Sequence, residues 1–151
     1  NPFRNRFISK RIRNIFVDIS STKILKNLSN YLNQKFDIII EDCSHQLIDQ
    51  ILCFKENFKN LKDGGIYVVE DLNFPEISNI YNPTGEKISL KIILEKIKLN
   101  ENVRSKYISD DDLNFIKKNI KSINFYVSKN KSKYLVDNTA EYSEIVFIKK
   151  K

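Results

Sequence analysis

Paired acidic residues follow two short apolar runs of this sequence, at residues 36–40 and 66–69. A 15-residue amphipathic stretch separates the runs and predicts a helix, so the runs themselves predict two parallel strands. Open α/β sheets bind ligands beyond the carboxyl ends of their strands. Acids gathered at such an edge repel one another, so we expect a cation or a proton to hold them. The acids are Glu41, Asp42, Glu70 and Asp71.

His45 is the only histidine of the chain and lies three residues after Asp42. Imidazole titrates near neutral pH, so it could accept a proton from a hydroxyl group or hold a substrate. The alternative is a histidine in the first turn of a helix, hydrogen-bonded to the backbone or to Asp42. Asp42 and Asp71 also have an alternative role, because Asp side chains favour the exits of strands, where they cap the following turn.

Apolar periodicity predicts the elements that position these residues. Apolar side chains recur at helical spacing in four segments, and the second helix is expected to end at Asp63-Gly64-Gly65. Residues 73–86 contain two prolines and a glycine and read as a loop. Ser20, Ser21 or Thr22 can cap the first helix. The predicted strands are residues 13–19, 36–40, 66–69, 123–128 and 144–148, and the predicted helices are residues 24–32, 46–61, 90–97 and 109–120.

Composition is consistent with one α/β domain. The chain has 151 residues, of which 41% are hydrophobic and 30% charged, enough for a buried core. It shows no signal peptide and no apolar run near the roughly 20 residues that cross a bilayer, so no membrane association is expected. Two cysteines make no disulfide framework. Free thiols in a reducing compartment, the cytoplasm, are therefore predicted.

The net charge of +7 has two interpretations. It could mark a nucleic-acid partner. The lysines are scattered, however, and no stripe of aromatic and basic residues supports nucleic-acid binding. A solvated basic surface is the favoured interpretation.

The two strand ends resemble the motifs of class I S-adenosylmethionine-dependent methyltransferases. The branch that they are similar to is the metal-dependent sugar and macrolide O-methyltransferases, with relatives described as cephalosporin hydroxylase-like. The fourth strand of that branch runs into Asp-Asp-Gly-Ser-His, and here the chain reads Glu41-Asp42-Cys43-Ser44-His45. The fifth reads Gly-Gly-x-Tyr-Val-x-Glu-Asp-Leu, which is intact here at residues 64–72. The resemblance is strong over about residues 11–75 and weak beyond.

This resemblance implies a function. The protein would transfer a methyl group from S-adenosylmethionine to a hydroxyl of a small molecule or sugar, assisted by Mg²⁺ or a similar divalent cation. Hard oxygen ligands favour Mg²⁺. The implied metal ligands are Asp42, Glu70 and Asp71. His45 would act as the general base, in a catalytic pair with Asp42.

The resemblance also implies cofactor contacts. Asp18 would receive the adenine amino group and Ile19 would lie beside the ring. The alternative for Asp18 is another strand exit followed by Ser20 as a helix cap, which is compatible with adenine binding. Asp42 and Cys43 would lie near the cofactor. Cys43 stands where the family has Gly, and its side chain narrows the space near the sulfonium.

Two cofactor-binding features of this class have no counterpart in the sequence. The chain begins with Asn1, contains no methionine and has only three glycines, so it lacks the glycine-rich turn that follows the first strand. It also lacks the ribose-binding acid after the second strand. We therefore expect residues 1–151 to form a single partial methyltransferase domain, the C-terminal two-thirds of a Rossmann-like sheet, with parallel strands and a final antiparallel strand.

Further expectations follow from a partial domain. Alone, the chain should bind S-adenosylmethionine weakly or not at all, and its exposed sheet edge should favour homo-oligomers. Two alternatives to the active enzyme remain. The first is an inactive methyltransferase-like protein that binds ligands or has a structural role, and Cys43 and the missing glycine-rich turn are consistent with it. The second is an RNA-binding or RNA-modifying protein.

Overall fold

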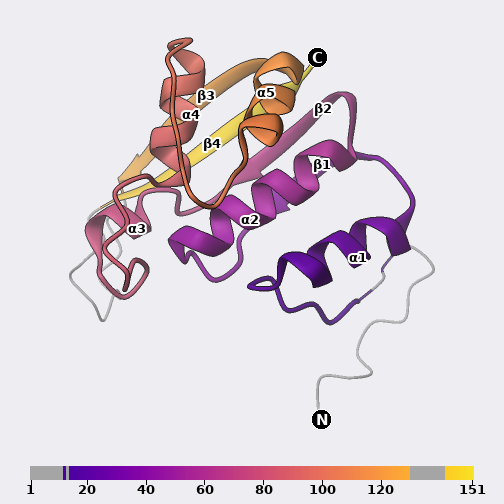
Figure 1. Cartoon of the computed structure of the whole chain (residues 1–151), viewed down its shortest axis with the longest axis horizontal. Coiled ribbons are helices and arrows are strands. Elements are labelled where there is room, and N and C mark those ends of the chain that lie inside the picture. The colour runs from indigo at the N-terminus through magenta and orange to yellow at the C-terminus, as the bar shows by residue number, and fades with distance from the viewer. Residues whose placement is uncertain (1–11, 13, 130–141) are drawn as a thin grey trace.

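A computed structural model describes residues 12, 14–129 and 142–151, and its centre is a four-stranded sheet in the order β1-β2-β4-β3 (Figure 1). β1 and β2 are parallel, whereas β4 is antiparallel to both of its neighbours, β2 and β3. Among the described strands, the last in sequence is thus the one that runs opposite to the rest, as predicted. The strands are β1 (Phe36–Glu41), β2 (Leu61–Val69), β3 (Ile120–Lys129) and β4 (Tyr142–Lys150).

The connection from β1 to β2 is helical and begins with α2 (Leu47–Asn57), followed by a short 3₁₀ turn, η1 (Phe58–Asn60). The predicted apolar stripe is buried, because Ile51, Phe54 and Phe58 have no exposed surface. Phe54 packs edge-on against Tyr67 of β2, with ring centroids 5.3 Å apart. Burial of a large apolar side chain contributes about 1.5–3 kcal/mol. This stripe therefore fixes α2, and with it the loop after β1, against the sheet.

Two further helices, α4 (Leu90–Lys98) and α5 (Asp110–Asn119), cover the same face of the sheet as α2 (Figure 1). Each begins at a serine cap that the sequence favours: Ser89 accepts a hydrogen bond from Ile92 N, and Ser109 accepts one from Asp112 N. Leu90, Ile93, Leu113 and Ile116 of these helices join the core.

The opposite face of the sheet carries exposed apolar side chains. Ile38 and Ile40 of β1 are 58% and 62% exposed, and Tyr126 of β3 is 55% exposed. Side chains alternate between the faces of a strand, so these lie opposite the core-facing Tyr67 and Val69. β1 pairs with β2 alone among the described strands and forms an edge of the sheet, in line with the expected exposed edge.

The strand predicted at residues 13–19 is not formed, and this expectation was wrong. Residues 14–18 have no regular structure, and Phe16 is fully exposed. A strand needs a neighbour for its backbone hydrogen bonds, and no described strand lies beside this segment. Val17 and Ile19 instead pack against Leu25 of α1 (Thr22–Leu32), which forms as predicted.

The glycine pair after α2 also differs from expectation. Gly64 and Gly65 lie inside β2 rather than at a helix end, since α2 ends at Asn57 and the strand begins at Leu61. A Cβ at Gly65 would lie 2.9 Å from the carbonyl oxygen of Lys62 and 3.1 Å from that of Asp37. The pairing of β1 with β2 is irregular here, and the backbones approach too closely for a side chain.

The predicted loop at residues 73–86 contains one short helix, α3 (Phe74–Ile77), with Pro75 in its first turn.

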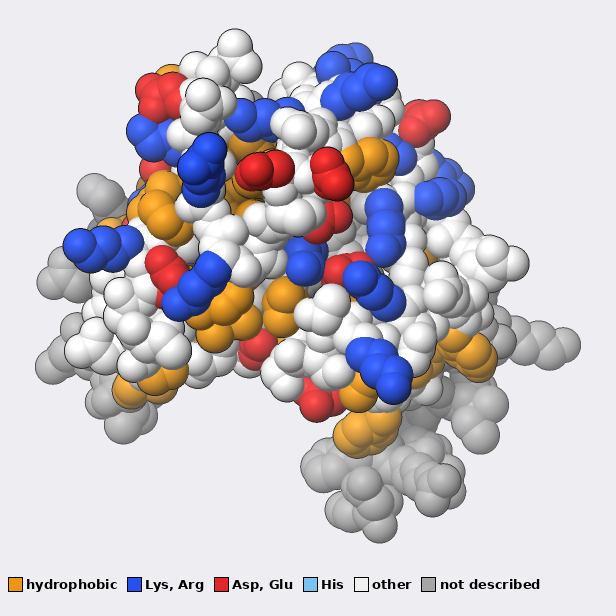
Figure 2. All heavy atoms as spheres, in the orientation of Figure 1, with side chains coloured by type: hydrophobic (Ala, Val, Ile, Leu, Met, Phe, Trp, Pro, Cys, Tyr) orange, Lys and Arg blue, Asp and Glu red, His pale blue; other side chains and the backbone are white. Residues whose placement is uncertain are grey.

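Cys43 and Cys53 are free thiols. On the face shown in Figure 2, lysines and arginines are interspersed with acids over the helices rather than gathered in one field. Within the described ranges, no helix combines the length and the hydropathy that a membrane span requires.

Candidate functional site

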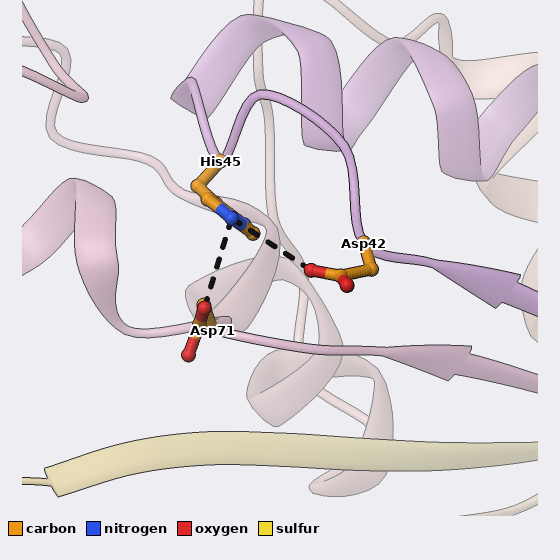
Figure 3. A group of neighbouring side chains, drawn as sticks. All are labelled: Asp42, His45 and Asp71. Carbon is orange, nitrogen blue, oxygen red and sulfur yellow. Dashed lines mark ion pairs between the residues drawn. The ribbon is translucent and has the colours of Figure 1, made fainter. Parts of the chain in front are cut away.

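Asp42, His45 and Asp71 converge at the carboxyl ends of β1 and β2 (Figure 3). One candidate ligand atom from each residue lies within 4.8 Å of the others. His45 Nε2 lies 3.7 Å from Asp42 Oδ1 and 3.7 Å from Asp71 Oδ2. Both distances exceed that of a hydrogen bond, so the three side chains surround a shared space rather than bonding directly to one another.

The backbone adopts left-handed conformations at two of these residues, with φ of +57° at His45 and +50° at Asp71. Such conformations cost a non-glycine residue about 1 kcal/mol or more and persist only where the surroundings impose them. At His45 the imposed turn leads directly into α2, whose first residue Leu47 donates its N–H to the carbonyl oxygen of Tyr81 at 2.9 Å. At Asp71 the turn follows the end of β2.

Two aromatic rings hold the imidazole of His45. Its ring centroid lies 5.3 Å from that of Phe74 and 6.1 Å from that of Tyr81, and these two rings lie 5.1 Å apart. His45 is 19% exposed, and its Nδ1 is buried without a hydrogen-bond partner. The packing therefore presents Nε2, rather than Nδ1, to the two carboxylates.

Glu41 and Glu70 behave differently from the two aspartates. Glu70 donates its backbone N–H to Glu41 O at 3.0 Å, and its side chain stands outside the group formed by Asp42, His45 and Asp71 among the described residues. Glu41 is 4% exposed and accepts the N–H of Cys43 at 3.2 Å. Burial raises the pKa of Glu41 from 4.5 to about 8. A proton therefore neutralises the buried Glu41 carboxylate near neutral pH.

Cys43 directly follows Asp42 and contacts Cys53 of α2. It is exposed, whereas Cys53 of α2 is buried. Contact with the Cys53 thiol lowers the pKa of Cys43 to about 6. The same contact, together with burial, raises the pKa of Cys53. The Cys43 side chain thus stands where the methyltransferases that this sequence resembles have glycine, and it contacts the Cys53 thiol.

The proposed adenine contacts, Asp18 and Ile19, lie in the turn before α1. Asp18 Oδ1 accepts the backbone N–H of Ser20 at 3.0 Å and its hydroxyl at 2.7 Å, which is the turn that the alternative interpretation expected. Of the three predicted candidates, Ser21 is the helix cap. Ile19 packs against the small cluster around Leu25. A cavity of about 260 Å³ is lined by Ser20, Gln46, Leu47, Ile48, Asp49, Tyr81, Asn82, Pro83 and Thr84.

Sequence reasoning missed several residues that shape the site. Phe74 and Tyr81 belong to a segment without periodicity, where an aromatic side chain gives no sign of its partner. Ser143 donates its hydroxyl to Asp71 Oδ1 at 2.6 Å from the far end of the chain. Gln50 lies on the predicted helix, but nothing in the pattern shows that its Nε2 donates to the carbonyl oxygen of Asp71.

The donor set fits a divalent cation. Ligands around Mg²⁺ lie about 2.1 Å from the ion and therefore about 3–4 Å from one another, close to the separations found here. Two carboxylate oxygens suit a hard cation such as Mg²⁺, and the imidazole nitrogen beside them can accept a proton. Asp42 is 58% exposed and Asp71 25% exposed, so the space between them is open to a ligand.

Comparisons with known proteins find similar sequences and folds, although no family model matches the chain. A curated relative, the 8-demethyl-8-alpha-L-rhamnosyl tetracenomycin-C 2'-O-methyltransferase of Streptomyces olivaceus, is 33% identical over 69 residues, which is 46% of this chain. Two solved structures of the MycE methyltransferase from the mycinamycin biosynthetic pathway each cover 95% of the chain. The complex with Mg and SAH has a TM-score of 0.58 at 22% identity, and the complex with Mg, SAH and mycinamycin VI has 0.61 at 20%.

These comparisons confirm the predicted resemblance and the methyltransferase fold. The chain spans 18% of the length of the curated relative and about a third of the solved chains, 34% and 32%. The fold similarity therefore covers nearly all of this chain but only part of each solved protein.

Proposed function

We propose that this chain belongs to an S-adenosylmethionine-dependent O-methyltransferase that methylates a sugar hydroxyl of a small molecule with the help of a divalent cation. The observation that carries the proposal is the convergence of Asp42, His45 and Asp71 at the ends of two adjacent parallel strands. The fold is that of proteins solved with Mg and SAH, which supports the same chemistry here.

The two aspartates would hold the cation through Asp42 Oδ1 and Asp71 Oδ2. When bound, the cation supplies Lewis-acid activation of the acceptor hydroxyl by lowering its pKa. Glu70 remains a candidate ligand from the strand-end motif, since it directly precedes Asp71. Because Asp71 comes from the loop after β2 and Asp42 from the loop after β1, the pairing of these strands sets the separation of the two ligands.

His45 would be the general base. Its Nε2 faces the space between the carboxylates, where it can accept the proton of the acceptor hydroxyl. Phe74 and Tyr81 fix the ring plane, and the carboxylates stabilise the imidazolium that results. Asp42 therefore serves twice, as a ligand and as a charge partner of the base.

Cofactor contacts would come from the turn before α1 and from the residues that follow β1. Asp18 and Ile19 are proposed to contact adenine, with Cys43 and Asp42 nearer the reacting methyl group. The cavity between Ser20, the start of α2 and Tyr81 lies next to His45 through the Tyr81 ring. A ligand in this cavity would thus contact Tyr81, whose ring packs against His45.

The acceptor class rests on the relatives. The curated relative is a 2'-O-methyltransferase of a rhamnosyl compound, and one MycE structure contains mycinamycin VI. A glycosylated small molecule is therefore the proposed acceptor. We further propose a cytoplasmic protein without a nucleic-acid partner, able to associate through the exposed edge of β1.

The test is methyl transfer by the natural protein that carries this chain, with labelled S-adenosylmethionine and a panel of glycosides and aglycones. Transfer to a sugar hydroxyl should cease with EDTA and return with Mg²⁺. Turnover that is indifferent to EDTA would contradict the metal-assisted mechanism, and transfer to RNA alone would contradict the proposed acceptor class.

A further inference from the structure

The two carboxylate oxygens of Asp71 have different partners. Oδ1 accepts the hydroxyl of Ser143 at 2.6 Å, whereas Oδ2 lies 3.7 Å from His45 Nε2. Ser143 belongs to β4 and is separated from Asp71 by 72 residues. One oxygen is therefore bound by the protein and the other is presented to the site.

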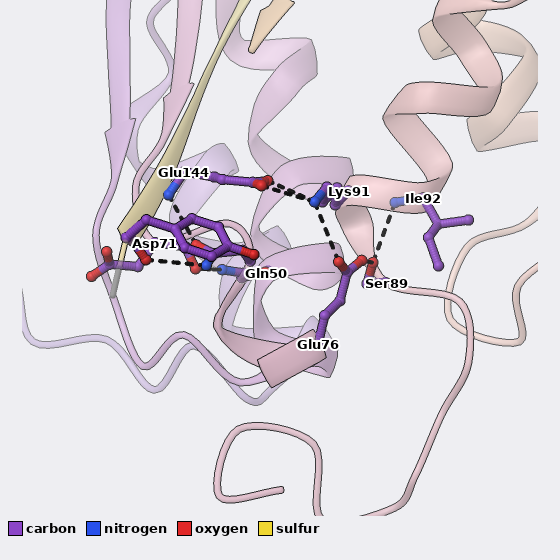
Figure 4. Close-up of polar contacts among 9 residues, drawn as sticks. Gln50, Asp71, Glu76, Ser89, Lys91, Ile92 and Glu144 are labelled. Carbon is purple, nitrogen blue, oxygen red and sulfur yellow. Dashed lines mark hydrogen bonds and ion pairs between the residues drawn. The ribbon is translucent and has the colours of Figure 1, made fainter. Parts of the chain in front are cut away.

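Backbone contacts fix the residues around Asp71. Leu72 donates its N–H to the carbonyl oxygen of Glu144 at 2.9 Å, and Glu144 donates its own N–H to Asn73 Oδ1 at 2.9 Å. Gln50 Nε2 donates to the carbonyl oxygen of Asp71 at 3.3 Å (Figure 4). These contacts hold the main chain in its left-handed turn. They do not fix the side-chain carboxylate of Asp71, whose rotation is restrained by the hydrogen bond from the hydroxyl of Ser143.

We propose that Ser143 is a positioning residue for a divalent cation at Asp71, an inference that rests on the function proposed above. A hydroxyl that donates to an ionised carboxylate makes a short, strong hydrogen bond. With Oδ1 held in this way, Asp71 offers Oδ2 alone as a ligand, directed at the space that it shares with Asp42 and His45. Groups that orient a metal ligand typically contribute 10–100-fold to metal affinity.

Ser143 should orient Asp71 and leave the other proposed ligand, Asp42, unaffected, because it contacts only the first of them among the described contacts. Asp42 is 58% exposed and follows β1, whereas Asp71 is 25% exposed and lies beside the start of β4. Removal of the Ser143 hydroxyl frees the Asp71 carboxylate to rotate and leaves the Asp42 turn unchanged. The expected defect is therefore weaker metal binding with an intact fold.

The experiment measures Mn²⁺ affinity of the 151-residue chain by electron paramagnetic resonance, with circular dichroism as a check of folding. The variants are Ser143→Ala, Ser143→Thr and Ser143→Cys. Threonine keeps the hydroxyl, and cysteine keeps the size of serine but donates weakly. Ser122→Ala on β3 is the matched control, because Ser122 pairs with Lys149 at the other end of the sheet.

Ser143→Ala should weaken Mn²⁺ binding by about 10–100-fold. Ser143→Thr should restore it to within about threefold, and Ser122→Ala should leave it unchanged. If the alanine variant does not fold, Ser143→Cys takes its place and should show the same loss. If the folded alanine or cysteine variant binds Mn²⁺ with the affinity of the wild-type chain, the role of Ser143 is overturned and the proposed function is unaffected. Absence of Mn²⁺ binding by the wild-type chain would overturn both.

Discussion

His45 Nε2 lies 3.7 Å from Asp71 Oδ2, although His45 follows β1 and Asp71 follows β2. The parallel pairing of the two strands, with Glu41 opposite Val69, brings their carboxyl ends to the same level. Left-handed turns at both residues then direct the side chains toward each other. The geometry of the site is thus set by strand register and by two strained turns.

Replacement of His45 by alanine should slow methyl transfer by about 10²–10⁴-fold in the natural protein, because a positioned general base contributes this much. Metal affinity should change little, since the aspartates remain. Single-turnover kinetics with saturating Mg²⁺ measure the transfer step directly. Tyr81→Phe, which keeps the ring against His45 and removes only its hydroxyl, is the matched control. A metal-binding defect in His45→Ala as large as its rate defect would instead make His45 a ligand.

Glu41 should make stability depend on pH in the absence of metal. Its pKa is about 8 in the folded chain and near its ordinary value of 4.5 when unfolded. Between these values the unfolded state binds fewer protons, so the free energy of unfolding should fall as pH rises from about 4.5 to 8, by at most about 1.4 kcal/mol per pH unit. Urea unfolding of wild type and Glu41→Gln at pH 5 and pH 8, with EDTA present, measures this.

Glu41→Gln should be the more stable chain at pH 8, and its stability should vary less between the two pH values. An equal pH dependence in wild type and variant would show that Glu41 ionises normally in the folded state.

Substitution of Gly65 by alanine should destabilise the chain by about 2–3 kcal/mol, because a Cβ there meets backbone oxygens that cannot move aside. Gly64→Ala is the matched comparison. Gly64 has a φ of +78° and open space around its Cβ position, so the cost there should be about 1 kcal/mol of backbone strain. Chemical denaturation measures the free energy of unfolding of both variants. A smaller loss at Gly65 than at Gly64 would contradict the close approach of β1 and β2.

Lys91 of α4 should contribute strongly to stability. Its Nζ lies 2.8 Å from Glu144 and 3.4 Å from Glu76 (Figure 4), with only 19% of the side chain exposed. Lys91→Met leaves the buried Glu144 carboxylate unpaired and should cost about 2–4 kcal/mol. Lys96→Met, on the same helix, breaks an exposed pair with Glu101 and should cost about 0–1 kcal/mol. Similar losses in the two variants by urea unfolding would refute this assignment.

The strand-end motifs and the α2 stripe were predictable because they are local patterns. A continuous apolar run suits a buried strand, and the spacing of Leu47, Ile51, Phe54 and Phe58 places them on one helix face. Residues 14–18 have a similar apolar character, but a strand forms only beside another strand, and local composition carries no information on that neighbour. The convergence of Asp42 and Asp71 followed from the predicted parallel pairing.

The rest of the site depends on long-range contacts. The hydrogen bond from Ser143 to Asp71 and the packing of Tyr81 on His45 join segments far apart in sequence. Their side chains belong to an irregular loop and to the first residues of a strand, where no periodicity marks an inward direction. The burial of Glu41, which separates it from the other acids, follows from packing against the core rather than from its position next to Asp42.

Mn²⁺ titration of the wild-type chain and of Asp42→Asn, Asp71→Asn and Asp111→Asn, followed by electron paramagnetic resonance, tests the central claim most directly. Asp111 is an exposed acid in the first turn of α5 and serves as the control. We predict a single bound ion in wild type and in Asp111→Asn, and at least a tenfold loss of affinity in each of the other two variants, all folded by circular dichroism. Binding that is equally tight in Asp42→Asn and Asp71→Asn would contradict a cation site between these two carboxylates.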